Sequence, residues 1–187
     1  MVNKKGFTLI ELIIVIAVIA ILATTVILVL NPVNILAEAR DSQRIADLGQ
    51  LSSALGLYLA TVSSPSMGVA ANCYAHRTDL GVNCQARHAG KTTTGSVSRV
   101  VTGAGWIPVN LSATSGGSPL SVLPIDPRNT TALFYSYLAP TSSTYEINAD
   151  MESARYGNTG SDDVESTDGG DSATIYEVGN DPGLDGV

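Results

Sequence analysis

The first thirty residues contain a long apolar segment that is interrupted by a single acidic side chain. The segment runs from Phe7 to Leu30, and its 24 residues would form a helix roughly 36 Å long, at about 1.5 Å per residue. A helix of that length can cross the hydrocarbon core of a membrane. Glu11 lies inside it, where a carboxylate costs about 2.5–3.5 kcal/mol on insertion scales. An acid at this position indicates a function and needs a partner.

The basic residues around this segment predict its orientation. Lys4 and Lys5 precede it, and the next basic residue is Arg40. Positive charge is retained on the cytoplasmic side, so we expect the short N-terminus inside the cell and the C-terminus outside. The sequence predicts a single pass through the cytoplasmic membrane.

Three interpretations compete for the segment. A cleaved secretory signal fits least, because the apolar run exceeds the usual 7–15 residues, contains Glu11 and lacks a small-x-small cleavage site. A plain transmembrane anchor explains the length and the orientation but gives Glu11 no role. A processed leader followed by a helix explains all three features.

The residues around Glu11 carry the third interpretation. Residues 4–11, Lys-Lys-Gly-Phe-Thr-Leu-Ile-Glu, resemble the processing site of type IV pilins and of the pseudopilins of type II secretion. In that family a prepilin peptidase cuts after the glycine and methylates the new N-terminus. The resemblance implies a leader of residues 1–6, cleavage between Gly6 and Phe7, and methylation at Phe7.

The resemblance also implies an assembly role for Glu11. Glu11 would follow the new α-ammonium of Phe7 by four residues and would pair with the ammonium of a neighbouring identical subunit. Two opposite charges attract strongly in a medium of low dielectric constant. The implied product is a homopolymeric filament, periplasmic or extracellular, into which an assembly platform protein transfers subunits from membrane lipid.

A different class of function remains open. A permanently anchored extracellular binding protein would have the same transmembrane segment but would keep its first residues. The N-terminal motif is also shared by pili and secretion pseudopili, so it does not separate these two.

Residues 31–62 continue the helical pattern. Apolar residues recur every three or four positions, as in an amphipathic helix with one buried stripe. Pro32 should interrupt the helix, because proline lacks the backbone donor. The expected polar side comprises Arg40, Asp41, Arg44, Asp47 and Gln50, and the apolar stripe comprises Ile45, Leu48, Leu51, Leu55, Tyr58 or Leu59, and Val62.

Residues 63–105 are rich in Gly, Ser, Thr and Ala, and we expect an irregular region there. It contains Cys73 and Cys84, for which the extracellular orientation favours a disulfide. A zinc site with His76 and His88 is the weaker alternative, because these spacings match none of the usual ligand patterns. Histidines in such a loop are expected at the solvated surface.

Residues 106–187 predict a β-sheet head. Trp106–Leu111 suggests an edge strand, and the runs 133–138 and 144–149 suggest a hairpin. The sequence Leu-Pro-Ile-Asp-Pro at 123–127 predicts a rigid turn, and with the following strands it is similar to the head of major pseudopilins. The predicted fold class is α+β, a long N-terminal helix packed on a small antiparallel sheet of about three to four strands.

The acidic residues gather at the C-terminal end. Residues 146–187 hold 11 acids and one base, Arg155, and the whole chain has a net charge of −7, which argues against nucleic acid as a direct partner. Flexible oxygen-rich loops suit calcium, and major pseudopilins often bind it in a similar loop. No catalytic motif is found, so no enzyme and no required cofactor are predicted. The calcium ligands predicted are Asp162, Asp163, Asp168 and Asp171.

Overall fold

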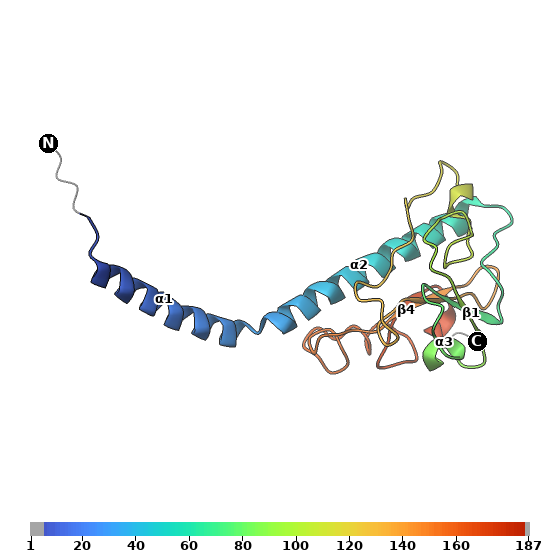
Figure 1. Ribbon diagram of the computed structural model, residues 1–187. Helices are drawn as coiled ribbons and strands as arrows, with labels where there is room; N and C mark the ends of the chain where they lie inside the picture. Colours follow the sequence, from blue (N-terminus) through green and yellow to red (C-terminus); the bar gives the residue numbers. More distant parts are fainter. Residues whose placement is uncertain (1–5, 186–187) are drawn as a thin grey trace. The chain divides into compact units, whose positions relative to one another are not determined.

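The computed structural model describes residues 6–185, which divide into two compact units at Ala37 and Glu38. The first unit holds helix α1 (Leu9–Leu30) and the start of helix α2 (Pro32–Thr61). The second holds the rest of α2 and the head (Figure 1). Lys4 and Lys5, on which the predicted orientation rests, lie outside the described residues.

Helix α1 begins at a side-chain cap and ends at a proline. Thr8 caps its first turn. Asn31 adopts a left-handed backbone with φ 39° at the C-cap. Pro32 then starts α2, a position where its missing N–H costs no hydrogen bond. The predicted break at Pro32 is confirmed.

Helix α2 contributes one face to the core of the head. Leu48, Leu51, Leu55 and Tyr58 are buried, as the periodicity predicts, and Leu59 is only half-buried. The helix ends at Thr61, shortly before Pro65.

The sheet of the head has five strands in the order β2-β1-β3-β4-β5. The central pair, β3 and β4, is the predicted hairpin, with Tyr137 opposite Ile147. All pairs are antiparallel except β1 with β2. The fold is therefore α+β and pilin-like, as predicted. The strands are β1 (Asn72–Ala75), β2 (Thr92–Gly95), β3 (Ser136–Leu138), β4 (Glu146–Ala149) and β5 (Tyr176–Gly179).

Two expectations about the strands are wrong. Residues 63–105 are not wholly irregular, because they supply β1 and β2, whose Asn-Cys-Tyr-Ala and Thr-Thr-Thr-Gly sequences are shorter than most strands. Residues 106–111 form no strand of the sheet. Only an isolated bridge joins Thr102 to Asn110, and Pro108 offers no backbone donor for a ladder. Trp106 is instead buried, and its indole N–H donates to the Pro124 carbonyl at 3.0 Å.

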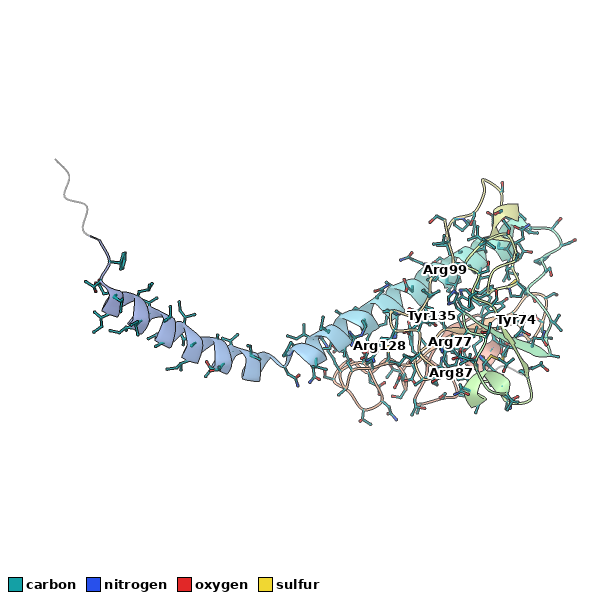
Figure 2. The ribbon with its side chains drawn as sticks, viewed as in Figure 1. Tyr74, Arg77, Arg87, Arg99, Arg128 and Tyr135 are labelled. Carbon is teal, nitrogen blue, oxygen red and sulfur yellow. A yellow bond between two sulfur atoms is a disulfide. The ribbon has the colours of Figure 1, made fainter. Side chains whose placement is uncertain are left out.

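Tyrosines of the sheet fasten it to α2. The Tyr135 hydroxyl donates to Asp47 Oδ2 at 2.9 Å, and the Tyr145 hydroxyl donates to the Ser52 carbonyl at 2.9 Å. Tyr135 is among the head residues labelled in Figure 2. Their rings are buried in the core, so each tyrosine combines apolar packing with a satisfied polar end.

A buried ion network joins α2 to the loops of the head, which corrects the prediction that Asp41 and Arg44 line an exposed polar face. The Arg44 guanidinium is fully buried and pairs with Asp126 at 2.6 Å and with Asp41 at 2.6 Å. Burial disfavours the charged guanidinium, but these two carboxylates outweigh it and raise the pKa of Arg44. Asp41 also accepts the backbone N–H groups of Glu152 and Ser153.

Asp126 has a second role within the predicted rigid turn. Its Oδ1 atom accepts the backbone N–H groups of Arg128 at 2.8 Å and Asn129 at 3.0 Å. The turn 123–127 therefore holds a carboxylate that is bound on one side by backbone and on the other by Arg44. Sequence analysis identified the turn but not this anchor.

We expect Arg44→Met to lower the free energy of unfolding by about 3–5 kcal/mol, because it leaves two carboxylates buried without their cation. The matched control is Arg128→Met. Arg128 also pairs with a carboxylate, Glu152 at 2.7 Å, but is 49% exposed, and its loss should cost at most about 1 kcal/mol. Denaturant unfolding of the full chain in detergent, followed by fluorescence of Trp106, measures both. Equal losses in the two variants would contradict the role given to Arg44.

Candidate functional site

The predicted processing site lies in exposed, non-helical backbone just before α1. Gly6, Phe7 and Thr8 precede the helix, and Phe7 is 88% exposed. A Cβ atom added at Gly6 would meet nothing within 4 Å. The fold of the described residues therefore does not require glycine at position 6.

Glu11 lies three residues after Thr8 and forms a capping box with it. The Glu11 Oε2 atom accepts the Thr8 backbone N–H at 3.0 Å and the Thr8 hydroxyl at 2.8 Å. In return the Glu11 backbone N–H donates to Thr8 Oγ1 at 3.3 Å. Both side-chain contacts use Oε2, which leaves Oε1 for a further donor. Glu11 thus has a local structural role that sequence analysis did not identify.

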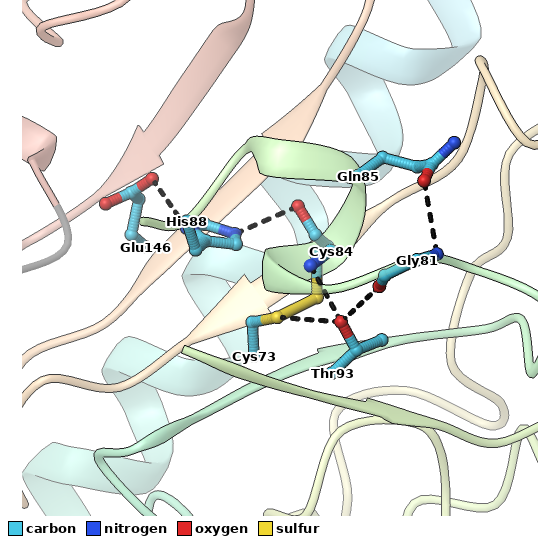
Figure 3. The surroundings of a disulfide bond; sticks show 8 residues. Cys73, Gly81, Cys84, Gln85, His88, Thr93 and Glu146 are labelled. Carbon is cyan, nitrogen blue, oxygen red and sulfur yellow. Dashed lines mark hydrogen bonds and ion pairs between the residues drawn. A yellow bond between two sulfur atoms is a disulfide. The ribbon is translucent and has the colours of Figure 1, made fainter. Parts of the chain in front are cut away.

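The two cysteines form the predicted disulfide (Figure 3). Cys84 lies in a short turn, α3 (Asn83–Ala86), in which all four residues have positive φ values. L-residues rarely adopt this conformation, so the turn needs outside support. Thr93 of β2 provides it, because its hydroxyl accepts the Cys84 N–H at 2.8 Å and donates to the Gly81 carbonyl at 2.6 Å.

His88 does not lie at the solvated surface, so that expectation is wrong for this residue. It is 3% exposed, and its Nε2 atom lies 3.1 Å from the Ser136 hydroxyl. Figure 3 shows His88 between the disulfide and Glu146, whose Oε1 atom is 3.7 Å from His88 Nδ1. Burial lowers the pKa of His88 to about 3, so the ring is neutral at physiological pH.

Three of the four aspartates of the acidic region are engaged by donors of the chain itself. Asp162 pairs with Arg155 at 2.6 Å, while Asp163 and Asp168 accept backbone N–H groups of their own loops. Within residues 6–185, no three His, Cys, Asp or Glu side chains are grouped so that they could hold a metal ion. Calcium binding here stays a prediction from the sequence.

The sheet also carries a polar layer that was not expected from the sequence. Glu146 and Asn148 alternate with Tyr145 and Ile147 along β4, a pattern usually read as a solvated strand face. Both are only 1% exposed, because the segment that follows the disulfide covers them. The polar alternation is visible in the sequence, but the cover is not.

The apolar helix and the head together define a class, the pilin-like α+β proteins. The side chains of α1 from Leu9 to Ile27 are exposed (Figure 2). Among the described helices, it alone is long and apolar enough to cross a membrane, over Leu9–Ile27 with a mean hydropathy of 2.9. A helix of this kind near the N-terminus fits the membrane anchor of a prepilin.

The N-terminus gives the more particular assignment. Residues 1–27 match the family described as the prokaryotic N-terminal methylation motif. This motif is the leader signature of type IV pilins and pseudopilins, which are structural proteins processed by a prepilin peptidase and assembled into pilus-like polymers. No curated protein and no solved structure matches the chain.

The buried Glu146 predicts an unusual pH dependence of stability. Burial, with a smaller contribution from neighbouring acids, raises the pKa of Glu146 from 4.5 to about 8, and that of Glu177 to about 7. Between pH 4.5 and about 8 the folded chain holds a proton on Glu146 that the unfolded chain releases. The free energy of unfolding therefore falls as the pH rises through this range. We expect the melting temperature to be several degrees lower at pH 9 than at pH 6. Glu146→Gln should flatten this dependence.

The control for this prediction is Glu38→Gln, which alters a half-exposed acid of α2. It should keep the full pH dependence. If Glu146→Gln melts with the same pH profile as the unaltered chain, the assigned burial of a protonated carboxyl is wrong.

Proposed function

We propose that the chain is a structural subunit of a type IV pilus-like or type II secretion pseudopilus filament. It is made as a prepilin, anchored in the cytoplasmic membrane with its N-terminus inside. A prepilin peptidase cleaves it after Gly6 and methylates Phe7. An assembly platform protein then moves it into a homopolymeric filament, periplasmic or extracellular.

The methylation motif is the observation that carries this proposal. The structure supports it in two ways. The Gly6–Phe7 bond lies in exposed, non-helical backbone, where a peptidase has access. Since the fold does not need glycine at position 6, the requirement for it belongs to the processing enzyme.

Helix α1 supplies the filament core in this proposal. Its large side chains are exposed on every face, Ile13 at 50% and Leu22 at 59% among them. Lipid covers them before assembly, and neighbouring α1 helices cover them afterwards. Little apolar area is gained in that exchange, so packing and charge pairing must bias the transfer.

Glu11 provides the charge pairing. Cleavage creates a cationic amine at Phe7, four residues before Glu11. The Glu11 Oε2 atom is engaged by Thr8 of its own helix, and its Oε1 atom is the acceptor for the amine of a neighbouring subunit. One carboxylate thus caps its own helix and binds the next subunit.

We expect Glu11→Gln to insert and be cleaved normally but to enter filaments at least about tenfold less, because a pair of this kind is worth more than 1.4 kcal/mol away from water. Glutamine also completes a capping box, so this variant removes the charge while it keeps the cap. The amount of chain in sheared, sedimented filaments measures incorporation.

The matched variant Thr8→Val removes the cap and keeps the charge. It should assemble far better than Glu11→Gln. Filaments of normal yield from Glu11→Gln, or failure of the two variants to the same degree, would contradict the charge-pairing mechanism.

A further inference from the structure

A polar pocket of about 490 Å³ lies on the face of the sheet opposite to the α2 core. Glu146 and Asn148 of β4 line it, and they alternate with Ile147, which points into the core beneath α2. Glu177 of β5, Asp171 and the backbone turn that follows Cys84 complete its walls.

Two acceptor atoms in this pocket have no hydrogen-bond partner among the described residues. They are Glu146 Oε2 and Asn148 Oδ1, and both side chains are 99% buried. A buried polar atom without a partner destabilises the fold. Once Glu146 has lost the proton that its raised pKa lets it hold, both atoms are acceptors, and the partner they then lack is a donor.

Acidic side chains outnumber basic ones around the pocket. Its acids are Glu146, Asp171, Glu177 and Asp185. Arg87 also lines the pocket, and its guanidinium donates to the Phe134 carbonyl at 2.6 Å and the Ala132 carbonyl at 2.9 Å. The neutral His88 adds no positive charge. The pocket therefore favours a cation.

The spacing of the acids decides which kind of cation fits. A calcium ion needs six to eight oxygens converging on one point, and no three acidic or histidine side chains among residues 6–185 are grouped in that way. A planar or extended cation with several N–H donors can reach acceptors that are farther apart. The volume also lies within the usual range for an organic ligand.

We propose that this pocket binds an organic cation, an alkylammonium or guanidinium group, through Glu146, Asn148 and Glu177. The group forms a salt bridge with Glu146 Oε2 and donates to Asn148 Oδ1, while Glu177 adds a second negative charge at the wall. The ligand is a lysine or arginine side chain of another protein, or a free amine of the same chemistry. This site is additional to the proposed filament function and does not depend on it.

The disulfide shapes one wall of the pocket. Gln85, Ala86 and Arg87 line it, and they directly follow Cys84. The left-handed backbone of this turn is held by the disulfide and by Thr93 (Figure 3). Oxidised protein is therefore the form to use in a binding experiment.

The test is calorimetric titration of the full chain in detergent, paired with thermal melting. The probes are the N-acetyl, N-methylamide derivatives of lysine and arginine for the protein source, and cadaverine for the free amine. The norleucine derivative, which has the same stem without the charge, is the control probe. We expect heat and a raised melting temperature with at least one cationic probe, and neither with norleucine.

Variants locate the binding. Glu146→Gln should weaken it by about 30-fold or more, since it removes one partner of a buried charge pair. Glu177→Gln should weaken it by a smaller factor and serves as the second variant if the first is unstable. Glu38→Gln should leave the affinity unchanged.

The pH dependence gives an independent check. The cation competes with the proton on Glu146, whose pKa is raised to about 8 by burial, so affinity should fall about tenfold for each pH unit below 8. The other groups facing Glu146 are His88 and Arg87 from the covering segment, and Glu177, Asp171 and Asp181 from β5 and its flanking loops. The acids among them strengthen this trend, while His88 stays neutral above pH 5.

Three results would overturn the proposal. The first is no heat and no shift with any cationic probe, which would mean that water satisfies the two acceptors. The second is an equal effect from norleucine. The third is a calcium-dependent shift, lost in Glu146→Gln, without any response to the organic cations. Binding by cadaverine alone would support the pocket and identify its ligand as a free amine.

Discussion

The constraint on which the rest of this chain depends is the apolar surface of α1. It is a helix of 22 residues whose large side chains are exposed on every face within the described structure. Nothing in water stabilises such a surface, so lipid or other helices must cover it. Glu11 is an acid near the N-terminal end of this surface. Placing its carboxylate among apolar groups costs free energy, and a partner is needed to offset that cost. Thr8 donates two hydrogen bonds to the Glu11 carboxylate in the capping box. The proposed ammonium of a neighbouring subunit supplies the opposite charge.

The head is stabilised by a different principle. Its core is apolar, but the junction between α2 and the loops is a buried ion network centred on Arg44. Removing one member of such a network is costly, while the intact network fixes the register of the groups it joins. Asp41 binds the backbone at residues 152 and 153, and Asp126 binds the turn at 128 and 129. A few charged groups therefore position long stretches that have little regular secondary structure.

The parts of the structure that sequence analysis predicted are those governed by local patterns. The apolar run, the break at Pro32, the periodicity of Leu48, Leu51 and Leu55, and the hairpin of β3 and β4 all follow from short-range signals. The methylation motif belongs to the same group, because it is a contiguous string. Local propensity and tertiary structure agree at these positions.

The parts that it missed depend on contacts between distant residues. Strands β1 and β2 are only four residues long; they pair with each other, and β1 also pairs with β3. Arg44 appears as a solvated helix residue until Asp126, 82 positions away, is placed against it. Glu146 is buried beneath the segment that follows Cys84, and His88 is the residue of that segment that lies against it. No periodicity in the sequence reports these long-range contacts.

The central claim is that the chain is a precursor whose mature form begins at Phe7. Mass spectrometry of the native protein, with a Gly6→Ala variant as control, tests it most directly. We expect the native chain to lack residues 1–6 and to carry one added methyl group on Phe7. The variant should fold as well as the native chain yet retain its leader. A native chain that keeps its first six residues would contradict the account and would favour a permanently anchored binding protein.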